Sequence, residues 1–449
     1  MIAPVAPVAP VASVAPVAPD AHRSPATWVL SLYFLQGLPF FMVNVLAGVM
    51  FKSLGVANDD IARWTGLLGL AWVFKPLWSP LLEAAPSKKW LVIGFQFAGA
   101  LALAGVALAL QLPAFFAAAI VVLGVVSIIS ASHDIACDGL YIATLNARSR
   151  AVYAGWLGAC FNGAKLFAVG GLVIVAGQLE EPLGVIMAWA CVFGIAALVM
   201  AVLAAYHVWV LPDTRPAVIE GRTTKLSGTL ADVMREFFRL PGVWWAIAFI
   251  VLFRAGEAQV QTIGPLFLKE ARAAGGLGLA TAEVGWSYGT AGTLAFLAGS
   301  VLSGYFTAWL GLKRALLTLV VAMNLPNLAF YLLAVWQPES LWLIAAAVSL
   351  ETFGYGFGFV AVILFMMQFV EHSRYQTAHY ALATGFMALG YVLFKTVSGD
   401  VQQALGYQHF FLWVLLCSLP VFVMLRWLPI RDEEQTPAAP PPRAEPAQA

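Results

Sequence analysis

Long apolar runs, separated by short polar segments, repeat along most of the chain. Each run has the roughly 20 residues that a helix needs to cross a hydrocarbon core about 30 Å thick, and none alternates like a strand of a membrane β-barrel. The pattern therefore predicts an all-α membrane protein with twelve transmembrane helices. The expected spans are residues 27–50, 62–83, 90–111, 114–142, 152–177, 183–210, 243–268, 283–309, 315–336, 340–370, 378–400 and 408–428.

The composition agrees with this pattern. Hydrophobic residues make up 61% of the chain and charged residues 10%, and the mean hydropathy is +0.85, which excludes a soluble globular domain. Residues 1–26 are rich in proline, alanine and valine, and residues 429–449 are polar and proline-rich. Proline this frequent prevents a helix, so we expect both ends to be disordered cytoplasmic tails.

Cysteine and charge exclude several classes of protein. All four cysteines fall inside expected spans, without a Cys-x-x-Cys pair or a neighbouring histidine set, so we expect no disulfide, no metal site and no cofactor. The net charge of +1 leaves no broad basic face, so nucleic acid is not an expected partner. The expected partners are a small-molecule solute and the lipid bilayer.

The basic residues predict an orientation. With a cytoplasmic N-terminus, 16 Lys and Arg residues fall on the inner side of the membrane and four on the outer side. The positive-inside rule therefore places both termini in the cytoplasm.

An internal repeat divides the chain. Residues 211–242 form the longest polar segment, an expected cytoplasmic linker between six-helix bundles at 27–210 and 243–428. Matching residues recur at an offset of 224 positions: Ser79 and Ser303, Lys89 and Lys313, and Ser149 and Ser373. Such a duplication is the build of the major facilitator superfamily, in which the solute site lies between the halves. A chance match between short serine- and basic-rich segments is the alternative.

Eight charged residues lie deep inside expected spans. A charge at the centre of a membrane helix costs at least about 2.5–3.5 kcal/mol, so such residues face a wet cavity or a partner and mark function. All eight lie on helices that border the cavity in the major facilitator architecture. They are Lys75, Lys165, Arg254, Lys395, Asp134, Asp138, Glu257 and Glu351.

Spacing predicts which of these charges interact. Arg254 and Glu257 are three positions apart and Asp134 and Asp138 four apart, so each pair shares a helix face. Two carboxylates on one face repel, so one of them is expected to be protonated or to have a cationic partner from another helix, and Lys75 can meet Asp134. A carboxylate that changes its partner as the halves move can couple transport to protons. Asp134 and Glu257 are the first candidates for this role, followed by Glu351.

Alternatives stay open for these residues. The Arg254–Glu257 pair could be purely structural. His133 could relay protons to its neighbour Asp134, or could simply hydrogen-bond to a carbonyl. Asp138 is either a gate residue or a solvated charge near the helix end.

Prolines and loop-facing charges are candidates for gating. Pro39 is expected to interrupt span 27–50, and Pro76 and Pro80 to interrupt span 62–83, because proline removes a helix hydrogen bond and lets helix halves move. The alternative is the general abundance of glycine and proline in transmembrane helices. Glu83 and Arg150, at the cytoplasmic ends of their spans, are further gate candidates.

Five segments resemble the motifs of a known family: "YFLQGLPFF", "GLAWVFKPLWSPLLE", "SASHDIACDG", "LFRAGEA" and "ETFGYGFGFVAVIL". They are similar to the motifs of AmpG-like permeases, in the peptide, acetyl-coenzyme A and drug branch of the major facilitator superfamily. The family's motif positions correspond here to Lys75, Asp134, Asp138, Arg254, Glu257 and Glu351.

The resemblance implies a monomeric permease that uses the proton gradient to import anhydromuropeptides across the inner membrane. Relatives that import siderophores such as pyochelin or rhizobactin, or that carry acetyl-coenzyme A, leave other cargoes open. Several positions depart from the family pattern. Ala143 stands where the family has a further acid, Arg148 and Ser149 stand where it typically has an acidic pair, and Tyr391 stands where it often has a basic residue, with Lys395 one turn later on the same face.

The residues and the resemblance together predict a proton-coupled importer of an anionic, amphipathic solute. Lys75, Lys165, Arg254 and Lys395 are the expected ligands of its acidic groups, and Tyr33 and Trp72 could stack on its sugars or apolar groups. An effluxer of drugs or metabolites is the alternative among transporters. A membrane acyltransferase using His133 and Asp134 is the alternative among enzymes, although the internal repeat argues against it.

Overall fold

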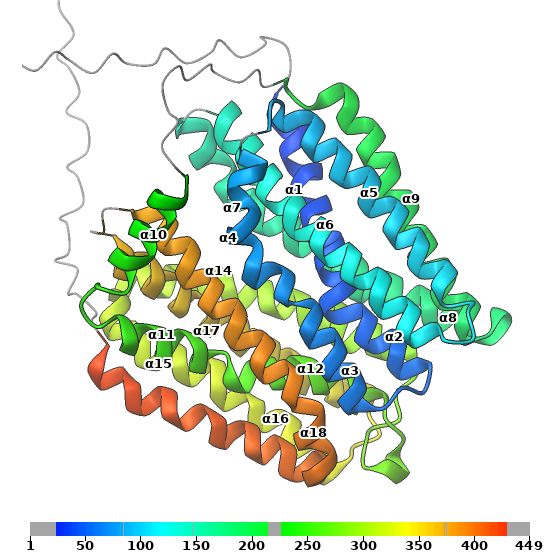
Figure 1. Ribbon diagram of the computed structural model, residues 1–449. Helices are drawn as coiled ribbons and strands as arrows, with labels where there is room; N and C mark the ends of the chain where they lie inside the picture. The colour runs from blue at the N-terminus through cyan, green and yellow to red at the C-terminus, as the bar shows by residue number, and fades with distance from the viewer. Residues whose placement is uncertain are drawn as a thin grey trace, which may run out of the picture.

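The computed structural model describes residues 24–83, 85–145, 147–213, 226–371, 373 and 375–428. Every regular element in this part of the chain is a helix (Figure 1). The α-helices are α1 Ala26–Phe41, α2 Ala47–Ser53, α3 Asn58–Leu68, α4 Leu70–Glu83, α5 Lys88–Ala109, α6 Phe115–Thr144, α7 Ala147–Lys165, α8 Val173–Leu183, α9 Val185–Val210, α10 Leu226–Phe237, α11 Val243–Phe253, α12 Ala255–Lys269, α13 Thr281–Val284, α14 Gly292–Leu310, α15 Leu312–Asn324, α16 Leu328–Trp336, α17 Leu341–Val370 and α18 Gln376–Met424. Three π-helices, η1 Met42–Leu46, η2 Leu166–Leu172 and η4 Gly285–Ala291, and three 3-10 helices, η3 Arg272–Ala274, η5 Leu325–Asn327 and η6 Leu425–Trp427, complete the list.

The predicted all-α membrane architecture is confirmed. Ten helical stretches in the described part of the chain are long and apolar enough to cross a membrane. One of them, Ala378–Trp427, contains the last two expected spans, which the non-helical backbone of Gly406 separates. The expected span 62–83 is not among the ten, because it is divided at Gly69 into α3 and α4.

The three predicted helix interruptions are wrong in position. Helix α1 continues through Pro39 and changes to the π-helix η1 only after it, and α4 continues through Pro76 and Pro80. The break falls at Gly69 instead. A Cβ on Gly69 would lie 2.7 Å from Val392 Cγ2 of α18, so the break coincides with a glycine that lets α18 pack closely against this segment.

The helices form two groups, which we call the N-terminal half (residues 24–213) and the C-terminal half (residues 226–428). In Figure 1, α3 and α18 converge at one end of the molecule, and α4 and α18 separate toward the other. We call the first the far end, which holds residues 54–57 and 270–280, and the second the linker end, which holds residues 211–213 and 226–242. Helix α10 lies within the expected linker and is attached to α18 by a hydrogen bond from His379 Nε2 to the Val233 carbonyl (3.1 Å).

Glycines bring the two halves into backbone contact toward the far end. Between η2 and η4, a Cβ on Gly289 would lie 2.0 Å from the carbonyl oxygen of Val169. Between α3 and α18, a Cβ on Gly399 would lie 2.5 Å from the carbonyl oxygen of Asn58. Only glycine permits such close approach, so these two seams depend on its missing side chain.

The positions related by the 224-residue offset lie in comparable places. Lys89 and Lys313 are each the second residue of a helix, α5 and α15, and Ser79 and Ser303 lie within the preceding helices α4 and α14. The duplication, and with it the division into two six-helix domains, stays a prediction. The expected tails lie outside the described residues, apart from residues 24–26.

Candidate functional site

A charged pair lies between α4 and α6 in the N-terminal half. Lys75 Nζ is 2.5 Å from Asp134 Oδ2, and Gln36 Nε2 donates a hydrogen bond to the other carboxylate oxygen, Oδ1. The Lys75 side chain is 33% exposed and that of Asp134 18% exposed, so both can be reached from outside the helix bundle. Asp138, one turn further along α6, accepts a hydrogen bond from Tyr33 Oη at 2.9 Å. The two carboxylates of α6 thus have different partners.

A second charged cluster lies in the C-terminal half, where α11 gives way to α12. Arg254 Nε is 2.9 Å from Glu257 Oε2, and the Arg254 side chain is 9% exposed and that of Glu257 1%. The guanidinium also lies over two aromatic rings, 4.7 Å from the ring centroid of Tyr391 and 5.1 Å from that of Phe359. Stacking of this kind stabilises a buried guanidinium, since the ring faces are electron-rich. The sequence had not indicated these aromatic partners.

Lys165 links the second cluster to the N-terminal half. It ends α7 and is 6% exposed, and its ammonium lies 5.0 Å from the ring centroid of Phe296 in α14. Two buried acids of the C-terminal half, Glu351 (2% exposed) and Glu257 (1% exposed), are near enough to interact electrostatically with this ammonium, but none of the ion pairs among the described residues joins them to it. Glu351 Oε1 has no hydrogen-bond partner among the described residues, so this carboxylate is left with an incomplete set of contacts.

His133 belongs to a buried polar chain rather than to the Lys75–Asp134 pair. Ser31 Oγ lies 2.9 Å from His207 Nε2, His207 Nδ1 donates to Gln96 Oε1 (2.9 Å), and Gln96 Nε2 donates to His133 Nε2 (3.0 Å). The amide of Gln96 thus joins the two imidazoles through its oxygen and its nitrogen. The ring of His133 faces α5, and the chain connects α1, α9, α5 and α6. These contacts fit a structural role, but His133 Nδ1 is buried without a hydrogen-bond partner among the described residues, and the proton-relay role of His133 stays a prediction.

The other predicted site residues are not part of the two charged clusters. Trp72 is half-buried, and its ring centroid is 5.0 Å from that of Phe40. Lys395 is 2% exposed and donates a hydrogen bond to the backbone carbonyl of Asn44. Glu83 and Arg150 belong to α4 and α7, but their side chains lie outside the described residues. Among the described residues, no group of three or more His, Cys, Asp or Glu side chains could hold a metal ion.

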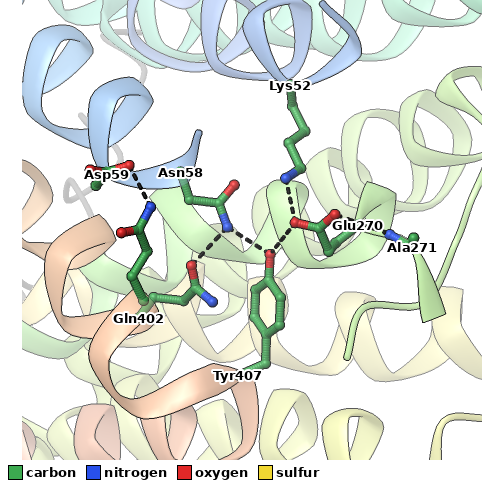
Figure 2. Close-up of polar contacts among 8 residues, drawn as sticks. Lys52, Asn58, Asp59, Glu270, Ala271, Gln402 and Tyr407 are labelled. Atoms are coloured by element: carbon green, nitrogen blue, oxygen red, sulfur yellow. Dashed lines mark hydrogen bonds and ion pairs between the residues drawn. The ribbon is translucent and has the colours of Figure 1, made fainter. Parts of the chain in front are cut away.

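A polar network joins the halves at the far end (Figure 2). Lys52 forms an ion pair with Glu270, and Tyr407 Oη donates to the same carboxylate at 3.2 Å. Asn58 Nδ2 donates to Gln402 Oε1 and to Tyr407 Oη, both at 2.7 Å. We call these five residues the far-end network.

Two further contacts flank this network. Gln403 Nε2 donates to Asp59 Oδ1, and Arg63 pairs with Asp400, both at 2.5 Å. Lys52 and Arg63 are two of the four basic residues that the orientation prediction places on the outer side of the membrane. No pattern along the chain shows which residues of the other half they meet.

Comparisons with known proteins agree with this architecture. The sequence profile of the Major Facilitator Superfamily matches residues 29–394, and the chain belongs to this superfamily of membrane transporters. It is similar to the anhydromuropeptide permease of Escherichia coli (strain K12), with 26% identity over 413 residues, which covers 88% of this chain and 78% of the permease.

Solved structures show the same fold at low sequence identity. A bacterial homologue of the human lysosomal transporter Spinster, in an inward-facing and unoccupied conformation, has a TM-score of 0.70 at 14% identity and covers 91% of this chain and 98% of its own. The D-xylose-proton symporter has a TM-score of 0.68 at 13% identity and covers 90% of this chain and 97% of its own.

Proposed function

We propose that this transporter imports anhydromuropeptides, or a closely related anionic and amphipathic solute, across the bacterial inner membrane together with protons. The similarity to the Escherichia coli anhydromuropeptide permease over most of the chain supports the choice of cargo. Basic side chains lie along the inter-half surfaces, and carboxylates of a peptide-bearing sugar are their natural partners. Trp72, which is half-buried, offers an aromatic surface for its apolar or sugar groups, whereas Tyr33 is 6% exposed and packs against Tyr141, so we assign it no contact with the solute in this state.

The observation that carries the coupling proposal is a set of buried charges at the boundary between the halves. Lys165 of the N-terminal half lies over the ring of Phe296 in the C-terminal half, and the buried carboxylates of Glu351 and Glu257 in that half are near enough to interact with it electrostatically. Movement of one half relative to the other changes the distance between these charges. A buried carboxylate that loses a cationic neighbour favours its protonated form, so the movement can bind or release a proton. Asp134, which is held by Lys75, can act in the same way in the N-terminal half.

The arrangement of contacts corresponds to one state of an alternating-access cycle. The far end is held together by the far-end network and the two glycine seams, whereas Lys75 and Asp134 remain partly exposed. The positive-inside rule assigns the linker end to the cytoplasm. In this proposal the structure represents an inward-open state, with the far end closed toward the periplasm and both termini in the cytoplasm.

Uptake by oriented membrane vesicles tests the proposal. Right-side-out vesicles containing the protein should accumulate radiolabelled anhydromuropeptide when an inward proton gradient is imposed, and a protonophore should abolish accumulation. Glu257→Gln and Glu351→Gln should lose accumulation but keep exchange of labelled for unlabelled solute, because exchange requires no net proton movement. Glu339→Gln, at an exposed far-end position, is the matched control and should behave as the wild type.

Two results would contradict the proposal. Accumulation that is indifferent to the protonophore and to both substitutions would reject proton coupling. Absence of muropeptide uptake in wild-type vesicles would reject the cargo, and a siderophore of the pyochelin or rhizobactin type would then be tested in the same vesicles.

A further inference from the structure

Lys395 is a lysine that has no acidic partner among the residues the structure describes. Its side chain lies in α18, is among the largest fully buried side chains, and is only 2% exposed. None of the ion pairs among the described residues includes it. Removing an ammonium group from water costs free energy unless the group is paired and hydrogen-bonded. The contacts of Lys395 must therefore compensate for its burial.

The contact that Lys395 does make comes from the other half of the molecule. Its ammonium donates a hydrogen bond of 2.9 Å to the backbone carbonyl of Asn44, in the π-helix η1. It also lies 5.7 Å from the ring centroid of Tyr391, its neighbour one turn back on α18. A carbonyl and a ring offer partial negative charge, and so they compensate a full positive charge only in part. π-helical turns are frequent at functional sites, and here one presents the carbonyl.

The contact belongs to the interface that closes the far end. Lys395 and Asn44 border a small cavity between the halves, together with Thr65, Gln261 and Thr262. Along α18, Gly399 follows Lys395 by one turn and packs against the backbone of Asn58, and the far-end network comes next. Separation of the halves at the far end therefore removes the carbonyl from the ammonium and opens this polar surface to the outside.

We propose that Lys395 binds an acidic group of the solute, a carboxylate or phosphate, only while the far end is open, and that the Asn44 carbonyl replaces this group as the far end closes. The inference rests on the proposed function for the direction of transport. Closure then exchanges a charged ligand for a neutral one that the protein itself supplies. This exchange lowers the affinity for the solute in the state with a closed far end, which releases it. The affinity is therefore higher in the state with an open far end, which takes the solute up.

The first test compares affinity at the two faces. Two radiolabelled probes are compared: anhydromuropeptide with free carboxyl groups, and the same compound with these groups amidated. The half-saturating concentration of each is measured in right-side-out and in inside-out vesicles. Because a charge-assisted hydrogen bond contributes about 1.5–3 kcal/mol, Lys395→Gln should raise the half-saturating concentration at the far-end face about tenfold or more and remove the preference for the free acid.

At the linker-end face Lys395→Gln should change little. Lys395→Arg should keep most of the preference, and Lys313→Gln, an exposed lysine, should match the wild type at both faces. Equal changes at the two faces, or none, would overturn the proposal.

The second test does not depend on the cargo. Thr65→Cys places a thiol in the same cavity. The substitution is made in a protein whose four native cysteines are replaced by alanine. Thr65 is 1% exposed, so a reagent can reach the thiol only when the far end opens. Two membrane-impermeant methanethiosulfonate reagents, one with a sulfonate and one with a trimethylammonium group, are applied from the far-end face. The sulfonate reagent should react faster relative to the cationic one when Lys395 is present, and Lys395→Gln should lower that ratio several-fold.

The two tests separate the two proposals. An unchanged ratio, or no reaction from that face, would overturn the role of Lys395 even if the vesicles transport muropeptide. A lowered ratio in a protein that transports no muropeptide would support the anion site and reject only the cargo.

Discussion

Gly289→Ala should shift the transporter away from the state with a closed far end. The Cβ of alanine would lie 2.0 Å from the carbonyl oxygen and 2.4 Å from the carbonyl carbon of Val169, and 2.6 Å from the amide nitrogen of Gly170. All three atoms are backbone atoms of the other half, so no side-chain rotation relieves the overlap. The halves must separate by about 1 Å or more at this seam to restore ordinary contact.

The size of the shift follows from the cost of overpacking. An added methyl group in a well-packed interface costs about 1–3 kcal/mol. The overlap exists only when the far end is closed, so this cost acts on one state and changes the ratio of closed to open molecules by about 5- to 150-fold. The fold of each half should be unaffected, since alanine is a better helix former than glycine.

Distance measurements between spin labels can detect the change. Labels at Gln111 and Glu339, exposed positions near the far end in the two halves, should give a longer and broader distance distribution in Gly289→Ala than in the unsubstituted protein. Gly171→Ala is the matched control, because a Cβ there meets nothing within 4 Å although it lies in the π-helix η2. A Gly289→Ala distribution that matches those of Gly171→Ala and the unsubstituted protein would refute the reasoning.

Three further substitutions test the charged and polar clusters. Arg254→Ala should lower the free energy of unfolding by about 3–5 kcal/mol, because it leaves the Glu257 carboxylate buried and unpaired. The double variant Arg254→Ala/Glu257→Gln should recover part of this loss. Unfolding in detergent micelles measures the free energy of both variants. Lys75→Asp and Asp134→Lys should each lower the initial rate of uptake, and the double exchange should restore part of it if their mutual attraction matters; no recovery would show that each acts alone. His207→Ala should lower the free energy of unfolding by about 1–3 kcal/mol, since it leaves the buried partners of His207 without a hydrogen bond. The pH profile of uptake should stay unchanged, and a shifted profile would contradict a structural role of the buried hydrogen-bonded chain from Ser31 to His133.

The sequence predicts the membrane architecture well because hydrophobic length is a local property. The start of α5 and of α6 could be placed within a few residues, and the charges inside spans identified Lys75, Asp134, Arg254 and Glu257 as residues to follow. Pairing between residues three positions apart, as for Arg254 at the start of α12 and Glu257 within it, follows directly from spacing.

Contacts between distant segments could not be predicted in this way. The pairing of Lys52 with Glu270 spans 218 positions and depends on how the two halves meet. The break at Gly69 was missed because proline is a visible local signal, whereas the close approach of α18 to α3 is not. Asn44 gave no signal either, since its contribution is a backbone carbonyl made available by a π-helix.

The most direct test of the account is the movement of protons caused by the solute itself. Right-side-out vesicles in weakly buffered medium, without an imposed gradient, are given anhydromuropeptide while the external pH is recorded. Symport predicts an immediate alkalinisation of the medium that a protonophore removes and that Glu257→Gln and Glu351→Gln lack. Uptake of the solute with no change in external pH would contradict proton coupling.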